Sequence, residues 1–254
     1  MRQELSVNLI ASLLAFLVGW IGRNLVHHYR TRKPAARVWR LDRGRRVVMV
    51  VGESRSGSSR YPKIPEADAL AAMNLRQSLS QDLRIHEAAT VRASAFVMAS
   101  DAEENLVVIG GPAQNAVWRL LADRLNAPFV FRQFPTEYRI VSADGSDGAE
   151  EYGETAVDGT TLVDHAIVLL ARNPFAARSR LVMVAGCGYL ATVGATQLFT
   201  RGGIRELAKG HDTASPLALV VSVESVGGYV TRPVVVAAVN FIQAPAGAAP
   251  ASQV

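Results

Sequence analysis

Three junctions at which an apolar run meets a glycine are the segments of this sequence best suited to hold a ligand. Glycine lets a ligand approach the backbone closely, and the free N–H groups at the start of a following helix attract an anion. The hydroxyl, guanidinium and amide groups nearby suit the phosphate, base or ribose of a nucleotide. The residues expected to contact this ligand are Gly52, Ser54, Arg55, Ser56 and Gly57 in the first junction, Gly110, Gly111 and Asn115 in the second, and Gly186 and Gly188 in the third.

None of the junctions matches a complete nucleotide-binding motif. In the first, Gly57 is followed by Ser58 and Ser59 rather than by the residues of a Walker A loop, and the G-x-G-x-x-G pattern is missing. The second, Gly110-Gly111-Pro112, loosely resembles a turn of nucleotide-sensing Rossmann-like domains, over these few residues only. The alternatives are a solvated loop at the first junction, a tight strand-to-helix turn at the second and close helix packing at the third.

Two carboxylates are the candidates for catalysis, because each lies at the end of an apolar run. They are Glu53 and Glu224. Either would serve as the acid or base of a hydrolase or nucleosidase acting on a nucleotide.

The remaining reactive side chains are interpreted as structural. Cys187 has no histidine near it in sequence and reads as a small packed residue. Asp164 and His165 are neighbours in an expected strand, where adjacent side chains point to opposite faces. The pair His27 and His28 lacks companion ligands, so no metal site is predicted, and the identity of any cofactor stays open.

The elements that must position these residues alternate between strands and helices. Short apolar runs at 47–52, 105–111 and 180–186 are typical of buried strands, and the spacing at 66–83 and 116–125 predicts helices. Two late apolar runs, 217–225 and 232–242, predict an antiparallel pair. Residues 47–243 are therefore expected to form an α/β, Rossmann-like domain with a mostly parallel sheet and antiparallel edge strands. Parallel strands would bring the three junctions to one rim of that sheet.

The N-terminal segment predicts a membrane anchor. An apolar stretch at 5–21 is followed at 23–46 by nine Lys/Arg and one acid, Asp42. A single transmembrane helix within 1–26 and a basic juxtamembrane linker at 27–46 would place the domain on the cytoplasmic side of the cell membrane. A cleaved signal peptide is disfavoured because the positive charge follows the apolar run, and a buried amphipathic helix because the run has no polar face.

The charge distribution favours a tether over a nucleic-acid binder. The chain carries +5 overall, but 23–46 carries +8 and 47–254 carries −3. The basic segment is therefore expected to face anionic lipid headgroups, and no nucleic-acid partner is predicted. The single cysteine excludes an intramolecular disulfide, and the Ala/Pro-rich residues 244–254 predict a disordered tail.

These observations favour one function and leave two others open. The first is a membrane-tethered cytoplasmic domain that binds or senses a nucleotide or similar anionic small molecule. The second is a membrane-anchored adaptor or scaffold that holds a protein partner without a ligand. The third is the nucleotide hydrolase or nucleosidase acting through a strand-end glutamate.

Overall fold

The computed structural model of the chain describes residues 2–54, 63–85, 89–145, 150–157, 161–227 and 229–243, without the side chains of 2–11 and 161. Three predicted contact residues, Arg55, Ser56 and Gly57, lie outside these ranges, as does the predicted tail. The helices are α1 (Arg2–His27), α2 (Lys33–Trp39), α3 (Glu66–Leu83), α4 (Ala99–Ala102), α5 (Ala116–Leu125), α6 (Tyr189–Ala195) and α7 (Arg201–Gly210), with a π-helical turn η1 (His28–Arg32) and the 3-10 turns η2 (Ser94–Phe96) and η3 (Thr196–Phe199).

The described strands form one large sheet and one small hairpin. The large sheet has the order β10-β9-β7-β8-β3-β1-β2, with β11 beside β9 and β6 beside β7, and β4 pairs with β5 separately. The strands are β1 (Val47–Val51), β2 (Ala89–Ala93), β3 (Asn105–Ile109), β4 (Phe129–Gln133), β5 (Tyr138–Ser142), β6 (Thr155–Ala156), β7 (Thr161–Asn173), β8 (Ala176–Gly186), β9 (Leu217–Val226), β10 (Tyr229–Val230) and β11 (Val234–Asn240).

The sheet confirms the α/β class and corrects the expected place of its antiparallel strands. Strands β2, β1, β3 and β8 are parallel, whereas β7 is antiparallel to both β8 and β9. Six of the described strands, β1, β2, β3, β6, β8 and β9, therefore run in one direction. The antiparallel strand β7 lies inside the sheet, because a tight turn after Asn173 sends the chain directly back as β8.

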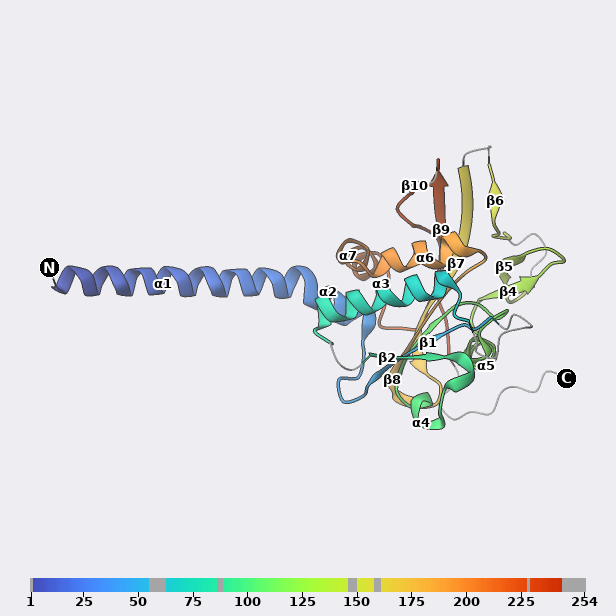
Figure 1. Ribbon diagram of the computed structural model, residues 1–254, viewed down its shortest axis with the longest axis horizontal. Helices are drawn as coiled ribbons and strands as arrows, with labels where there is room; N and C mark the ends of the chain where they lie inside the picture. The colour runs from blue at the N-terminus through green and yellow to red at the C-terminus, as the bar shows by residue number, and fades with distance from the viewer. Residues whose placement is uncertain are drawn as a thin grey trace.

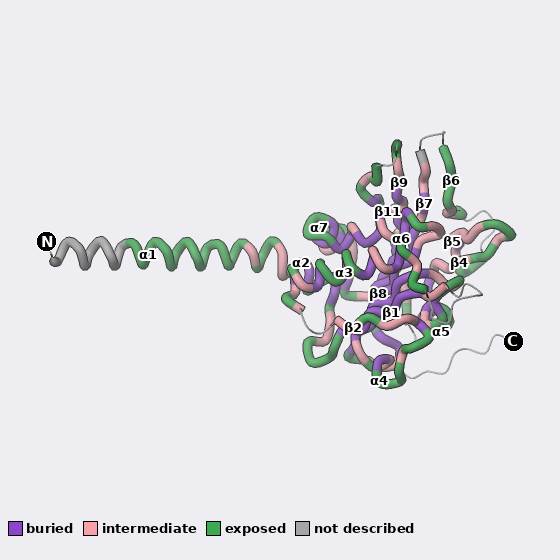
Figure 2. The backbone as a smooth tube through the Cα atoms, viewed as in Figure 1, coloured by how far each residue is buried: buried purple, intermediate pink, exposed green. Residues whose placement is uncertain are grey.

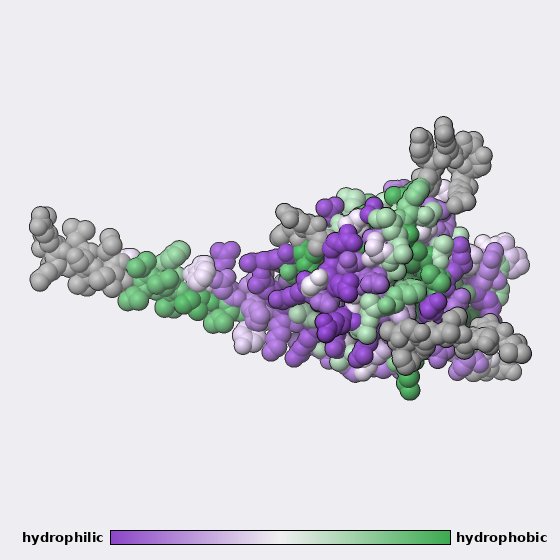
Figure 3. All heavy atoms as spheres, turned by 90° about the horizontal axis from the view of Figure 1, so that it is seen from below, coloured by the Kyte–Doolittle hydropathy of each residue, from purple (hydrophilic) through white to green (hydrophobic). Residues whose placement is uncertain are grey.

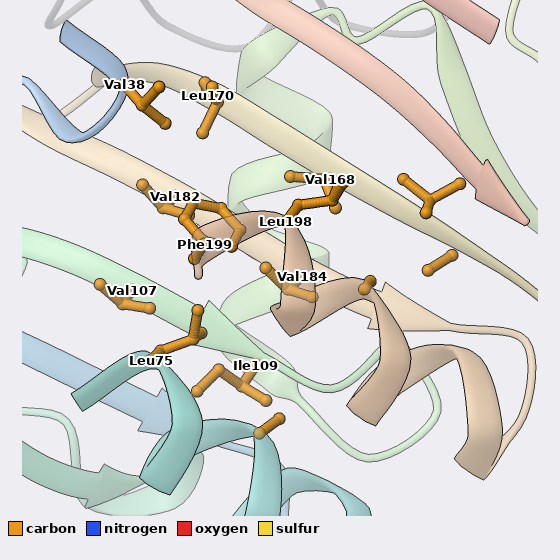
Figure 4. Close-up of a cluster of buried hydrophobic side chains, with 14 of the residues drawn as sticks. Val38, Leu75, Val107, Ile109, Val168, Leu170, Val182, Val184, Leu198 and Phe199 are labelled. Carbon is orange, nitrogen blue, oxygen red and sulfur yellow. The ribbon is translucent and has the colours of Figure 1, made fainter. Parts of the chain in front are cut away.

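Helices cover both faces of the sheet, as strands buried on both faces require. One face packs against α2, α3, α6, η3 and α7, and the other against α5 and the β4–β5 hairpin. The alternation within β3 shows this division: Val107 and Ile109 join the first core, and Leu106 and Val108 the second. Figure 2 shows the buried strands at the centre, and Figure 4 shows Val107, Ile109, Val182 and Val184 facing Leu75 and Phe199.

The basic segment 27–46 is folded onto the domain, which corrects its interpretation as a linker. In α2, Ala35, Val38 and Trp39 are fully buried, and Trp39 packs against Phe199 with ring centroids 4.7 Å apart. Pro34 lacks an N–H group, so the regular hydrogen-bond ladder breaks there, and the π-helical turn η1 precedes it. The apolar spacing of α2 forms a narrow stripe that docks on α7 while its basic residues stay at the surface.

Helix α1 projects away from the rest of the molecule (Figure 1). Its described side chains include nine large apolar residues that are exposed. Among the residues whose side chains are described, no helix is both long and apolar enough to cross a membrane.

Candidate functional site

The three glycine junctions meet at the carboxyl ends of parallel strands β1, β3 and β8, as expected. Val51 lies opposite Ile109 and Ile109 opposite Val184, so Gly52, Gly110 and Gly186 follow at similar heights. The backbone N–H of Gly110 donates to the carbonyl of Val184 at 3.0 Å. We call this edge, defined by the three glycines, the glycine rim.

At the first junction, a carboxylate of the protein itself occupies the glycine pocket. Asp68, in the first turn of α3, is buried, and its Oδ2 accepts a hydrogen bond from the N–H of Gly52 at 2.9 Å. Gly110 has φ +88°, and a Cβ at that position would overlap the same carboxylate. Burial raises the pKa of Asp68, and the hydrogen bond from Gly52 partly opposes this. The glycines therefore admit an internal anion.

At the second junction, Asn115 is the N-cap of α5. Its Oδ1 accepts hydrogen bonds from the N–H groups of Val117 and Trp118 at 3.0 and 3.2 Å, and its Nδ2 donates to the carbonyl of Ile109 at 2.8 Å. The residue is fully buried. The expected presentation of this amide to a base or ribose is corrected to a structural role, because the cap uses its oxygen and its amide holds the strand end.

At the third junction, Asp164 of β7 fills the start of α6. Its carboxylate accepts hydrogen bonds from the N–H groups of Gly188 at 3.1 Å, Ala191 at 2.7 Å and His165 at 2.7 Å. The N–H of Gly186 donates to the hydroxyl of Thr192 at 3.0 Å. Burial raises the pKa of Asp164, and the nearby Glu154 adds to this. The N–H groups expected to hold an external anion are thus satisfied within the chain.

The two catalytic candidates lie far apart. Gly186 is opposite Ala166 and Ala166 opposite Val221, so Glu224 stands three residues, about 10 Å, beyond the rim along β9. Four strand spacings, about 19 Å, separate β9 from β1, which precedes Glu53. Glu224 is exposed and belongs to the last part of β9, which projects past α6 (Figure 1). The two carboxylates do not form a catalytic pair.

Cys187 is held at the rim as a neutral thiol. Its Sγ lies 3.5 Å from the carbonyl oxygen of Tyr152, and its N–H donates to the carbonyl of His165 at 2.8 Å. The His165 ring packs beside Tyr152, and its Nδ1 is 2.8 Å from the carbonyl oxygen of Gly153. Burial raises the pKa of the Cys187 thiol to about 12, with Asp164 contributing. These contacts agree with the expected structural role.

A large cavity lies at the opposite, amino end of the sheet. Its volume is about 990 Å³, and it opens at the foot of α1, where Figure 3 shows a hydrophilic surface following the apolar helix. Seven Lys/Arg, three Asp and two His line it, giving a surplus of positive charge: Arg32, Lys33, Arg37, Arg40, Arg43, Arg45, Arg84, Asp42, Asp82, Asp212, His28 and His211. We call it the amino-end cavity.

The three carboxylates of this cavity are engaged in local contacts. Asp42 accepts a hydrogen bond from the N–H of Gly44 at 2.9 Å, and Asp82 pairs with Arg201 at 3.2 Å. Asp212 accepts hydrogen bonds from Ser215 and from the N–H of Ala214, and these lower its pKa. The cavity's positive charge is therefore only partly balanced from within.

A buried arginine lies behind the cavity wall. Arg180 is only 3% exposed, and its Nη2 donates to the carbonyl of Thr213, a lining residue, at 3.2 Å. Within the described ranges, no carboxylate lies within 4 Å of its guanidinium, and its Nε has no hydrogen-bond partner. Burial, with a contribution from the cations Arg40 and Arg172, lowers the pKa of Arg180 to about 10.

Two lining arginines have an unusual backbone conformation. Arg40, after α2, has φ 46°, and Arg84, after α3, has φ 59°. This left-handed region favours glycine or asparagine, as at Asn126 after α5 with φ 52°. Both of these arginines line the amino-end cavity.

The amino-end cavity was missed by reasoning from the sequence because its walls come from three separate segments around 28–45, 82–85 and 208–214. The spacing of Ala35, Val38 and Trp39 was the available signal that the basic segment packs against a core.

Comparison with known proteins assigns the chain to no family. It matches no protein-family model, and no curated protein and no solved structure resembles it significantly. The functional conclusion therefore rests on the geometry of these two ends of the sheet.

Proposed function

We propose that this chain is a single-pass membrane-tethered binding module, with α1 in the bilayer, the domain on the cytoplasmic side and an anionic small molecule as its ligand. The observation that carries the tether is the exposed apolar surface of α1. The large apolar side chains of this helix that are 40–70% exposed are Leu13, Leu14, Phe16, Leu17, Val18, Trp20, Ile21, Leu25 and Val26.

An isolated helix with this surface needs an apolar environment. At about 100° per residue, the exposed apolar side chains spread over more than half of the helix circumference, and the remaining side carries mainly the small residues Ala15, Gly19 and Gly22. The helix therefore has no broad polar face to turn toward water. Its 26 residues span about 39 Å, more than the roughly 30 Å of a bilayer core. The basic residues from Arg23 onward favour a cytoplasmic position for the domain.

The ligand part of the proposal moves from the glycine rim to the amino-end cavity. At the rim, Asp68, Asn115 and Asp164 already accept hydrogen bonds from the N–H groups expected to bind an anion. At the amino end, cations outnumber carboxylates around a cavity of a size typical of small-molecule sites. Electrostatics therefore favours an anion at the amino end.

Membrane extraction tests the tether. Full-length chain in a membrane fraction should resist alkaline carbonate, and the double variant Leu14→Arg/Leu17→Arg should be released, because each charge near the helix centre opposes insertion by about 3 kcal/mol. The matched control is Val236→Arg/Ile242→Arg, which puts two charges on exposed apolar residues of the domain. Release of the wild-type chain by carbonate would contradict the proposal.

Orientation is tested with a single introduced cysteine. Asp123→Cys, on the exposed side of α5, should react with a membrane-impermeant maleimide in inverted vesicles and not in intact spheroplasts. Cys187 provides a silent background, because its raised pKa keeps the thiol protonated. Labelling in intact spheroplasts would place the domain outside.

A second candidate, the adaptor, has one observation in its favour. Edge strand β11 and the residues after it expose Val234, Val236, Val239 and Ile242, and exposed apolar edge strands pair readily with other chains. In the adaptor, Val236→Lys should abolish self-association of the full-length chain in detergent, measured by light scattering. If the chain is monomeric at all concentrations, self-association through β11 cannot be the basis of an adaptor function.

A further inference from the structure

We infer that the amino-end cavity is a site for a multiply charged phosphate-bearing anion, held by Arg40 and the other basic residues that line it, with the buried positive charge of Arg180 behind its wall adding to the attraction. The phosphate belongs either to a lipid headgroup or to a soluble phosphorylated compound. Only the possibility that the phosphate comes from a membrane lipid rests on the proposed function. The chemistry of the site does not depend on it.

The charge of Arg180 has no carboxylate partner among the described residues. A buried guanidinium without a carboxylate is strongly unfavourable unless an anion balances it. The charged neighbours that act on Arg180 are the cations Arg40 and Arg172, so the described surroundings increase the imbalance. A bound anion removes it.

Two hydrogen-bonded residues connect Arg180 to the cavity wall. Thr213 lies between them, because its carbonyl accepts from Arg180 Nη2 and its hydroxyl donates to the carbonyl of Arg37 at 3.1 Å. On the other side, the buried Asn105 accepts from the N–H of Arg180 at 3.0 Å and donates to the carbonyl of Asp42 at 2.8 Å. These hydrogen bonds hold Arg180 directly behind the segments around Asp42 and Thr213, which line the cavity.

A second buried donor without a partner in the described part of the chain lies at the cavity itself. This donor is the Nε of the lining residue Arg32. Arg40 and Arg84 end α2 and α3 in the left-handed conformation that is common at helix C-termini, and both line the cavity. Arg32, Arg40 and Arg84 therefore bring three guanidinium groups to one cavity.

The chemistry of guanidinium groups selects phosphate. The planar guanidinium group of an arginine can donate two parallel hydrogen bonds to the oxygens of one phosphate. Several arginines together therefore favour a ligand with several acceptor oxygens. A volume of about 990 Å³ admits a phosphorylated ring or chain rather than a single inorganic ion. Because His28, Arg32 and Lys33 line the cavity where α1 enters the domain, a lipid headgroup can reach it from the bilayer surface.

Calorimetric titration of the full-length chain tests the site. Soluble inositol trisphosphate is titrated into the chain in nanodiscs of neutral phosphatidylcholine, and we expect saturable one-to-one binding. Arg180→Met and Arg40→Gly should each weaken this binding at least tenfold. Asn126→Gly makes the same backbone change as Arg40→Gly at the end of α5 and should leave the affinity unchanged.

Thermal unfolding of the same variants distinguishes a ligand contact from a structural role. Arg180→Met removes an unpaired buried charge and Arg40→Gly removes backbone strain, so the ligand-free variants should unfold at or above the wild-type temperature. Wild-type chain that binds no inositol trisphosphate would overturn the inference. Unchanged affinity in Arg40→Gly, and in Arg180→Met where it folds, would also overturn it.

A second titration identifies the source of the phosphate. In nanodiscs containing phosphatidylinositol bisphosphate, a headgroup in the cavity should weaken inositol trisphosphate binding at least tenfold, compared with phosphatidylserine nanodiscs of equal charge. Equal affinity in both supports the site and assigns it a soluble ligand. A chain that carbonate extracts but that binds inositol trisphosphate would support the site and contradict the membrane tether. A chain that resists carbonate but binds no inositol trisphosphate would support the tether and contradict the site.

Discussion

At the carboxyl end of the sheet, the carboxylate of Asp164 accepts hydrogen bonds from three backbone N–H groups, whereas at the amino end the guanidinium of Arg180 has no carboxylate within 4 Å in the described chain. Both groups are ionisable and buried. The first is balanced by the protein and stabilises a strand-to-helix turn. The second is left for another molecule to balance.

The comparison shows what a glycine after a strand does and does not indicate. Gly52 and Gly110 mark a place where an oxygen approaches the backbone closely, and that oxygen belongs to Asp68. A close approach to backbone is therefore compatible with an internal partner as well as with a ligand. The balance of buried charge is the more direct indicator, and it favours the amino end.

The largest effect is expected from removing the internal anion at the rim. Asp164→Ala leaves three N–H groups near the start of α6 without an acceptor, and we expect a loss of about 4 kcal/mol in the free energy of unfolding. Urea denaturation measures it. The control Asp123→Ala, on an exposed helix surface, should change stability by less than about 0.5 kcal/mol. A loss below about 1 kcal/mol would show that the rim donors are free for a ligand.

The second-largest effect tests whether Gly110 is needed to leave room for the carboxylate of Asp68. Gly110→Ala combines a positive φ with an overlap against Asp68, and we expect a loss of about 3 kcal/mol. Gly145→Ala has a similar φ of +65° but open space around it, so it should lose only about 1 kcal/mol. Equal losses would remove Asp68 from the explanation.

A pH series tests the neutral thiol at the rim. The pKa of Cys187 is raised from 9.0 to about 12 in the folded chain, so its contribution to stability is present below pH 9 and is lost as the pH rises toward 12. Between pH 8 and pH 10, wild-type chain should lose about 1.4 kcal/mol relative to Cys187→Ala. Parallel pH profiles for the two proteins would indicate an accessible thiolate and reopen a catalytic role.

The smallest effect is expected at the amino-end cavity, from a substitution of Arg40. Arg40→Gly at the amino-end cavity should stabilise the ligand-free chain by about 0.5 to 1 kcal/mol, because glycine relieves the left-handed strain at a small cost in chain entropy. Asn126→Gly should change stability less, since asparagine tolerates this conformation. Denaturation in phosphate-free buffer measures both. Destabilisation by Arg40→Gly would show that this arginine supports the fold.

Much of the fold follows from local patterns. Helices α3 and α5 begin and end at the expected residues, 66–83 and 116–125, because helical spacing is a property of neighbouring positions. Strands β1 and β3 follow from short apolar runs. The place of β7 inside the sheet did not follow, since strand order depends on pairing between distant segments.

The candidate site shows the same division more sharply. The sequence alone determined that glycines follow three buried strands and that positive charge is concentrated before residue 47. Only the tertiary structure decided that Asp68 and Asp164 satisfy the rim and that Arg180, beside the basic segment, has no carboxylate partner among the described residues. The physical reason is distance along the chain: Asp42 and Asn105 are 63 residues apart, and Thr213 and Arg37 are 176 apart. Partners of that kind leave no local pattern, because their contacts exist only once the strands between them have paired.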